Sequence, residues 1–192
     1  MCTPDRYHRA VTPSDATYPP PPPTISGERV LLRRLSGDDR PRMRAILAEP
    51  EVARWWAPRG ADEAADGLFD DGEVVYAIMV EGAVVGAVEY SEENKPDYRH
   101  AGIDIFIDTK YQGHGLGRDA IQTMARYLFE KRGHHRLTID PAVANERAIR
   151  AYKKVGFRPV GIMRDYERGA DDAWHDGLLL DLLAGELAGA PE

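Results

Sequence analysis

The sequence predicts a single α+β domain built around one central sheet. Short segments with the alternation of strands are mixed with segments of helical periodicity, and two of the strands are joined by a tight turn, as in a hairpin. The 192 residues, 43% of them hydrophobic, suit one domain with a sizeable core. A second full domain is therefore not expected.

The first strand is expected over residues 30–35, and a helix follows it. Ser36 and Asp39 have the spacing of a capping box, in which two side chains satisfy backbone N–H groups at a helix start. The apolar residues that come next recur at helical spacing and supply a buried face, formed by Met43, Ile46 and Leu47.

Two further strands are expected over residues 74–80 and 83–90. Glu81 and Gly82 separate them, and glycine tolerates the positive φ that a tight hairpin turn requires. The two segments therefore form an antiparallel pair.

A strand over residues 103–107 alternates isoleucines with Asp104 and Phe106, so that Asp104 points to the face opposite the isoleucines. An amphipathic helix follows between Gly115 and Arg132. Its apolar residues recur at the spacing of one helix face, namely Ile121, Met124, Ala125, Leu128 and Phe129.

The last third of the sequence predicts three strands and one helix. A short strand covers residues 137–140, and Asn145 then caps a helix that ends at Gly156. Strands over residues 157–163 and 174–182 follow.

Both ends of the sequence are predicted to be tails. Residues 1–26 lack apolar periodicity and contain five consecutive prolines at 19–23, which favour polyproline II over helix or sheet. We expect this segment to be a disordered, proline-rich N-terminal tail, the domain to cover residues 27–185, and residues 186–192 to be a C-terminal tail.

Composition excludes several classes of partner. The formal net charge of -7 argues against nucleic acid and favours a cationic partner. One cysteine allows no intrachain disulfide, and neither the cysteine nor the histidines have the spacing of a metal site, so no metal is expected. No apolar stretch is long enough to span a membrane, and we expect a cytoplasmic protein, either a monomer or a homodimer.

Residues 111–118, with the sequence Tyr-Gln-Gly-His-Gly-Leu-Gly-Arg, lie between a predicted strand and a predicted helix. Alternate glycines allow the backbone to approach a ligand closely, and a helix N-terminus attracts a pyrophosphate. The glycine spacing and the lack of an early βαβ unit count against a Rossmann site. No Lys-Ser or Lys-Thr follows the last glycine, so the segment is not a Walker loop either.

A second motif, residues 145–157, follows about 30 residues later. Together with the glycine segment it resembles, in order and spacing, the two signatures of the GNAT superfamily of N-acetyltransferases, and the resemblance covers residues 28–184. It implies a mixed, mostly antiparallel sheet that is splayed at a cleft for acetyl-CoA and flanked by helices. The coenzyme-binding residues that it implies are Phe106, Ile107, Gln112, Gly113, His114, Gly115, Leu116, Gly117, Arg118, Asn145, Ala148, Tyr152 and Lys154.

Within the superfamily, residues 51–56, 101–107 and 138–141 look like those of the aminoglycoside 6′-N-acetyltransferases. Siderophore-pathway acyltransferases that act on hydroxylysine are similar in the tryptophan segment, and ribosomal-protein acetyltransferases are similar in general layout. The resemblance implies acetylation of a primary amine on a small polycation. Hydroxylysine-type amines, protein N-termini and a catalytically silent, coenzyme-binding regulatory domain stay open as alternatives.

The resemblance also implies roles for five side chains. Tyr152 would protonate the departing sulfur and Asp104 would bind and deprotonate the acceptor amine, while Asp97, Asp140 and Trp56 would help to bind the acceptor. Each has an alternative: Tyr152 could be core, and the aspartates could be ordinary solvated acids. Of the adjacent tryptophans, one is expected to pack and the other, Trp56, to form a platform for the acceptor.

Overall fold

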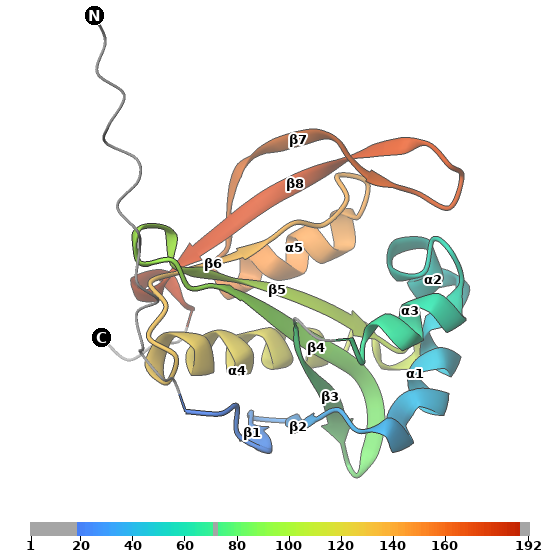
Figure 1. Ribbon diagram of the computed structural model, residues 1–192, viewed down its shortest axis with the longest axis horizontal. Coiled ribbons are helices and arrows are strands. Elements are labelled where there is room, and N and C mark those ends of the chain that lie inside the picture. Colours follow the sequence, from blue (N-terminus) through green and yellow to red (C-terminus); the bar gives the residue numbers. More distant parts are fainter. Residues whose placement is uncertain (1–18, 71–72, 189–192) are drawn as a thin grey trace, which may run out of the picture.

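The computed structural model describes residues 19–70 and 73–188, which form a mixed eight-stranded sheet flanked by helices (Figure 1). The strand order is β1-β2-β3-β4-β5-β6-β8-β7, and only β5 and β6 pair in parallel. The α+β class and the mostly antiparallel sheet are therefore confirmed. The strands are β1 Thr24–Ser26, β2 Leu31–Arg34, β3 Val74–Val80, β4 Ala83–Glu93, β5 His100–Ile107, β6 Arg136–Ile139, β7 Arg158–Arg168 and β8 Trp174–Leu183.

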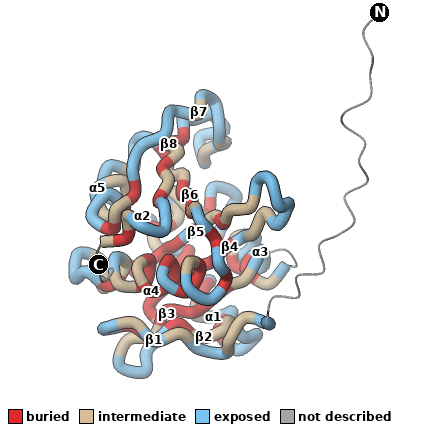
Figure 2. The backbone as a smooth tube through the Cα atoms, turned by 90° about the vertical axis from the view of Figure 1, so that its left-hand side faces the viewer, coloured by how far each residue is buried: buried red, intermediate tan, exposed pale blue. Residues whose placement is uncertain are grey.

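The helices lie on both faces of this sheet. They are α1 Arg40–Leu47, α2 Pro50–Trp56, α3 Ala61–Gly67, α4 Leu116–Glu130 and α5 Glu146–Val155. Helices α4 and α5 contribute to one apolar cluster, and α1, α2 and α3 to a second one. Alternate strand residues serve the two clusters: Tyr76 packs on the α4 side, whereas Ala77 packs on the α1 side. The most buried backbone lies between these layers, and much of β7 is exposed (Figure 2).

Local sequence patterns predicted most of these elements correctly. In the predicted capping box, the Ser36 N–H donates to the Asp39 carboxylate at 2.9 Å, and a 3₁₀ turn, η1 Gly37–Asp39, then leads into α1. Glu81 and Gly82 both have positive φ, 49° and 82°, so the hairpin turn between β3 and β4 is confirmed. Asn145 caps α5 by accepting from the Ala148 N–H at 3.2 Å.

The predicted tails require correction at both inner ends. Thr24–Ser26 pairs with β2, and the carbonyl of Pro22 accepts a hydrogen bond from the Tyr76 hydroxyl at 2.8 Å. Near the other end, Leu187 is only 7% exposed and packs into the core. Residues 19–26 and 186–188 therefore belong to the folded domain. Long-range contacts hold them there, and such contacts cannot be predicted from a local sequence pattern. The rest of both tails lies outside the described residues.

Strand β5 positions the site, because β6 separates from it. Only Ala101 and Gly102 of β5 pair with β6, whereas the pairing with β4 continues from His100 to Ile107. The second half of β5 therefore has one edge that no strand of the described chain covers. Its side chains alternate as predicted, since Ile103 and Ile105 join the α4 cluster and Phe106 joins the α1 cluster.

None of the helices in the described ranges is long and apolar enough to cross a membrane.

Candidate active site

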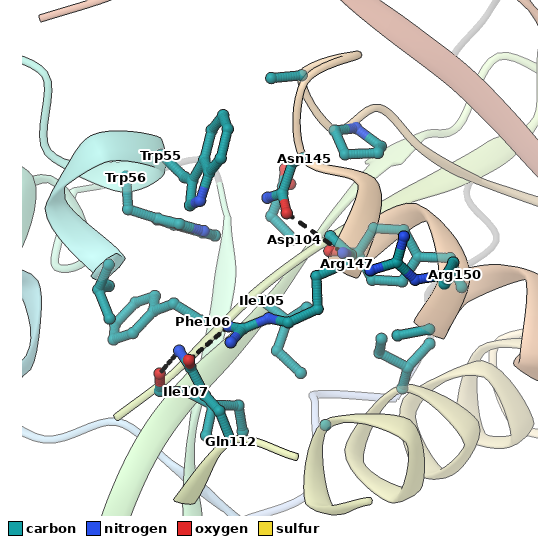
Figure 3. Close-up of a pocket in the computed structure, with 18 of the residues that line it drawn as sticks. Trp55, Trp56, Asp104, Ile105, Phe106, Ile107, Gln112, Asn145, Arg147 and Arg150 are labelled. Atoms are coloured by element: carbon teal, nitrogen blue, oxygen red, sulfur yellow. Dashed lines mark hydrogen bonds between the residues drawn. The ribbon is translucent and has the colours of Figure 1, made fainter. Parts of the chain in front are cut away.

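A cavity of about 700 Å³ opens where β5 and β6 separate. Helix α2, strand β5, the glycine-rich segment, helix α5 and strand β7 all contribute to its lining. Figure 3 shows the labelled side chains from α2, β5 and α5 around it. A second cavity of about 440 Å³ adjoins it. The two share the side chains Asp104, Asp140 and Tyr166.

One half of the large cavity is built from the glycine-rich segment and the start of α4. Gly113 and Gly115 both have φ of 82°, a conformation that side chains with a Cβ rarely adopt, and Gly115 is the N-cap of α4. A residue from before β2 holds the segment in place, since the Arg29 guanidinium donates a hydrogen bond to the His114 carbonyl at 2.5 Å. Backbone N–H groups at this helix start suit a pyrophosphate.

Basic side chains border the same half of the cavity. Arg118 comes from α4, and Arg147, Arg150 and Lys154 come from α5. Arg147 donates to the Gln112 side-chain oxygen, and the Gln112 amide donates to the Ile107 carbonyl at 2.6 Å (Figure 3). These contacts join the end of β5 to α5, and the positive charges suit a ligand with several phosphates.

Tyr152 lies where the two halves of the cavity meet. Its side chain on α5 is 7% exposed and borders the cavity, and its ring centroid is 6.3 Å from that of Phe157. Burial raises the pKa of the Tyr152 hydroxyl, and the charges of Asp104 and Asp140 raise it further. The hydroxyl therefore keeps its proton near neutral pH, and both aspartates lie close enough to influence it.

The other half of the cavity is acidic. Asp104 borders the cavity, and its pKa is raised to about 7. The main cause is the loss of hydration in the cleft, and the negative charges of Asp140, Glu73 and Glu167 raise the pKa further. Asp140 accepts a hydrogen bond from the Tyr166 hydroxyl at 2.6 Å. That bond is the main reason why the pKa of Tyr166 is raised, to about 12.

These carboxyl groups lack basic partners. Other carboxylates of the described chain do have basic partners, for example Asp39 with Arg33 at 2.7 Å and Asp181 with Arg136 at 2.9 Å. In the described part of the chain, no Lys, Arg or His lies within ion-pair distance, 4.0 Å, of five acids that border the two cavities, namely Glu73, Glu89, Asp104, Asp140 and Glu167. Glu92 and Glu93, which border the smaller cavity, are paired with Arg132 and Lys95. A cation from outside could neutralise the five acids.

The two tryptophans divide their roles differently from the expectation. Trp56 makes the packing contact, edge to face with Phe106 at a centroid distance of 4.9 Å. Trp55 lies under Arg54, whose guanidinium carbon is 4.3 Å from the ring centroid. Both rings border the cavity (Figure 3). Trp56 therefore both packs against Phe106 and lines the cavity, instead of having only one of these roles.

Most residues named from the sequence border the large cavity, but three do not. Leu116 is 4% exposed and belongs to the core, and His114 is exposed outside the lining. Asp97 is exposed on the 3₁₀ turn η2 Pro96–Tyr98 and borders neither cavity. The expectation that Asp97 borders the cleft is therefore wrong, because η2 follows the end of β4 rather than the splayed part of β5.

Sequence reasoning missed several lining side chains, namely Glu89, Arg147, Tyr166 and Glu167. A signal existed for Glu89, which is a single acid inside the apolar run of β4. Tyr166 and Glu167 gave none, since their strand was expected to end at residue 163, whereas β7 continues to Arg168.

The family model described as "Acetyltransferase (GNAT) domain" matches residues 29–158. An aminoglycoside N(6')-acetyltransferase type 1 of Klebsiella pneumoniae is 28% identical over 162 residues, covering 72% of this chain and 78% of that protein. A spermidine N(1)-acetyltransferase of Escherichia coli K12 is 29% identical over 143 residues, covering 71% and 76%. The structure of spermidine N-acetyltransferase from Vibrio cholerae in complex with CoA and spermine superposes with a TM-score of 0.70, at 21% identity, covering 82% of this chain and 97% of that one.

Proposed function

Since the chain belongs to the GNAT acetyltransferase family and its donor is acetyl-CoA, we propose that it acetylates a primary amine of a small polycation. The acceptor we favour is an aminoglycoside, modified at its 6′-amine. The observation that carries this proposal is the group of cleft carboxyls without basic partners, since a polycation supplies the charges that they lack. Each contact between a carboxylate and an ammonium contributes about 1.5–3 kcal/mol.

The coenzyme half of the cleft fits the donor. Positive-φ glycines and the start of α4 offer backbone N–H groups to the pyrophosphate, while Arg118 and Arg147 supply positive charge. The uncovered edge of β5 around Phe106 and Ile107 can hold the pantetheine arm as an added strand. The coenzyme itself supplies an activated acetyl thioester.

Asp104 and Tyr152 divide the proton transfers between them. An ammonium group must lose a proton before its nitrogen can attack, and a carboxylate with a pKa near 7 accepts that proton more readily than an ordinary one near about 4. Tyr152 keeps its own proton on the hydroxyl oxygen and can donate it to the leaving sulfur. Positioning of the two reactants provides the larger part of the rate.

A linear polyamine is the second candidate acceptor. The smaller cavity continues past Asp104 towards Glu73 and Glu93, so an extended chain with several ammonium groups could follow it. The similarity to the spermidine N(1)-acetyltransferase agrees with this candidate.

Release of thiol from acetyl-CoA in the presence of single amines tests these candidates. The panel contains kanamycin, tobramycin, spermidine, an N-hydroxylated lysine derivative and a peptide with a free N-terminus, and NMR of the product locates the acetyl group. We expect activity with kanamycin and tobramycin at the 6′-amine. Activity with the lysine derivative or the peptide alone would contradict the proposal. If no amine gives thiol release, the result would favour a regulatory coenzyme-binding domain.

A further inference from the structure

Glu89 on β4 is a buried carboxyl group that the mechanism above does not use. Its side chain is 9% exposed and borders the large cavity. Its Cα is the direct partner of the Asp104 Cα in the antiparallel pair of β4 and β5. The two carboxyl groups therefore project from the same face of the sheet, side by side.

The groups that face Glu89 are mostly acidic. Glu73 comes from the segment before β3, and both its charge and its side-chain hydrogen bond to Glu89 oppose the ionisation of Glu89. The charge of Asp104 adds a smaller effect in the same direction. Three other acids border the cavity: Glu51 on α2, Asp140 after β6 and Glu167 on β7. Tyr166 borders it as well. The cations of the cavity come from α4 and α5, and within the described ranges none forms an ion pair with Glu89, namely Arg118, Arg147, Arg150 and Lys154.

Two neighbouring carboxyl groups, one of them buried, are costly to ionise together when no cation lies between them. The pair therefore keeps a proton. Burial raises the pKa of Glu89 to about 9, and the charges of Glu73 and Asp104 add to that effect, whereas the pKa of Asp104 is raised only to about 7. The larger shift favours Glu89 as the group that retains the proton. An ammonium group that enters beside the pair favours the ionised form of both groups.

We propose that Glu89 is a further acceptor-binding carboxyl group, which keeps its proton until an ammonium group of the acceptor enters beside Asp104. The inference rests on the proposed function, because it needs a polycationic acceptor. In this step the O–H bond of the Glu89 carboxyl breaks, the proton passes to solvent, and the carboxylate pairs with the ammonium. Because the amine that reacts loses its charge, Glu89 selects acceptors that carry at least one further ammonium group.

Calorimetry measures the released proton directly. Tobramycin and spermidine are titrated into the CoA-bound enzyme at about pH 7.5 in two buffers with different enthalpies of ionisation, for the wild type and Glu89→Gln. The amines of each probe change their own protonation in both proteins, so the difference between the proteins isolates Glu89. We expect Glu89→Gln to release about one proton fewer.

Kinetics separate this role from a purely structural one. Glu89→Gln should raise the KM for the polycation about 10-fold to 100-fold, with little change in kcat, because a charge-assisted contact is lost while Asp104 remains. Glu81→Gln, in the exposed turn between β3 and β4, is the matched control and should behave as wild type.

Equal proton release by the wild type and Glu89→Gln would overturn the inference while leaving the proposed function intact. If neither probe binds although CoA does, the proposed function and the inference both fail. Should Glu89→Gln not fold, infrared difference spectra of the wild type decide the question. Loss of the carbonyl band of a protonated carboxyl group on probe binding supports the inference, and an unchanged band refutes it.

Discussion

The two halves of the cleft are made of different material. The coenzyme half consists of main-chain groups at the glycine-rich segment and at the starts of α4 and α5, with basic side chains around them. The acceptor half consists of carboxyl side chains from β4, β5 and β7 and from the segments next to β3 and β6. Under the proposed function, main-chain groups would bind what every acetyl-CoA presents, whereas side chains can change with the acceptor while the fold stays the same.

The halves also differ in charge balance. Arg147 is held by Gln112, and Arg29 holds the glycine-rich segment, so the coenzyme half is braced by its own contacts. Burial raises the pKa values of Asp104 and Glu89, neighbouring acids raise them further, and no cation of the described chain forms an ion pair with either group. The acceptor half therefore has an excess of negative charge that a cationic ligand would neutralise. We expect substitutions in the coenzyme half to weaken CoA binding, and substitutions in the acceptor half to affect turnover or acceptor binding.

The largest effect is expected for Asp104→Asn, which removes the proton acceptor but keeps the shape of the side chain. Turnover should fall about 10²-fold to 10⁴-fold, whereas the Kd for CoA should stay within a factor of about two. In the wild type, kcat/KM should rise with pH up to an apparent pKa near 7, and this limb should vanish in the variant. Rate measurements from pH 5 to 9 test both points, and an unchanged acid limb would assign the base to another group.

Tyr152→Phe should lower turnover about 10-fold to 10³-fold, because the proton donor is lost while the packing against Phe157 survives. Coenzyme affinity should be nearly unchanged, since the ring remains. Steady-state kinetics and calorimetry with CoA together provide the check. Equal turnover of the two proteins would mean that water protonates the leaving sulfur.

Glu89→Gln should change how stability depends on pH. The pKa of Glu89 in the folded protein lies above its value in the unfolded chain, so its contribution is complete below about pH 4.5 and is lost as pH rises towards about 9. Without ligands, the free energy of unfolding of the wild type should therefore fall by about 1–3 kcal/mol more than that of the variant between pH 5 and 9. Urea unfolding measures this difference, and parallel curves would show that Glu89 is ionised throughout.

Gly115→Val should weaken CoA binding about 10-fold or more, because Gly115 has φ of 82° and must allow the pyrophosphate close to the backbone. Acceptor binding should change little, since the acceptor half is not involved. Gly161→Val is a control, as a Cβ there meets no atom within 4 Å. If CoA affinity is the same in both variants, the glycine-rich segment does not hold the coenzyme.

The smallest effect concerns two aspartates. Asp140→Asn should raise the KM for the acceptor about 10-fold and leave that for acetyl-CoA unchanged, because Asp140 borders both cavities. Asp97→Asn should change neither by more than about two-fold, since Asp97 is exposed outside them. Similar increases for both variants would mean that η2 joins the acceptor site after all.

The backbone features of the proposed coenzyme half could be predicted from the sequence because they are local. A glycine at positive φ, a helix cap three residues from its partner N–H and a helix start each lie within one short segment, such as 111–118 or 145–157. The resemblance to a known family rests on the same segments. The alternation that turns Asp104 away from the isoleucines is also local, with a period of two residues.

Only the tertiary structure decided the acceptor half. Glu89 meets Asp104 through strand register, Tyr166 reaches Asp140 across 26 residues, and Asp97 is excluded by the position of its turn. The sequence determined which backbone segments line the basic half of the cavity and in which order they occur. Strand pairing and the separation of β5 from β6 determined which acids share a cavity, because such contacts depend on packing between segments far apart in the chain, which no local pattern encodes.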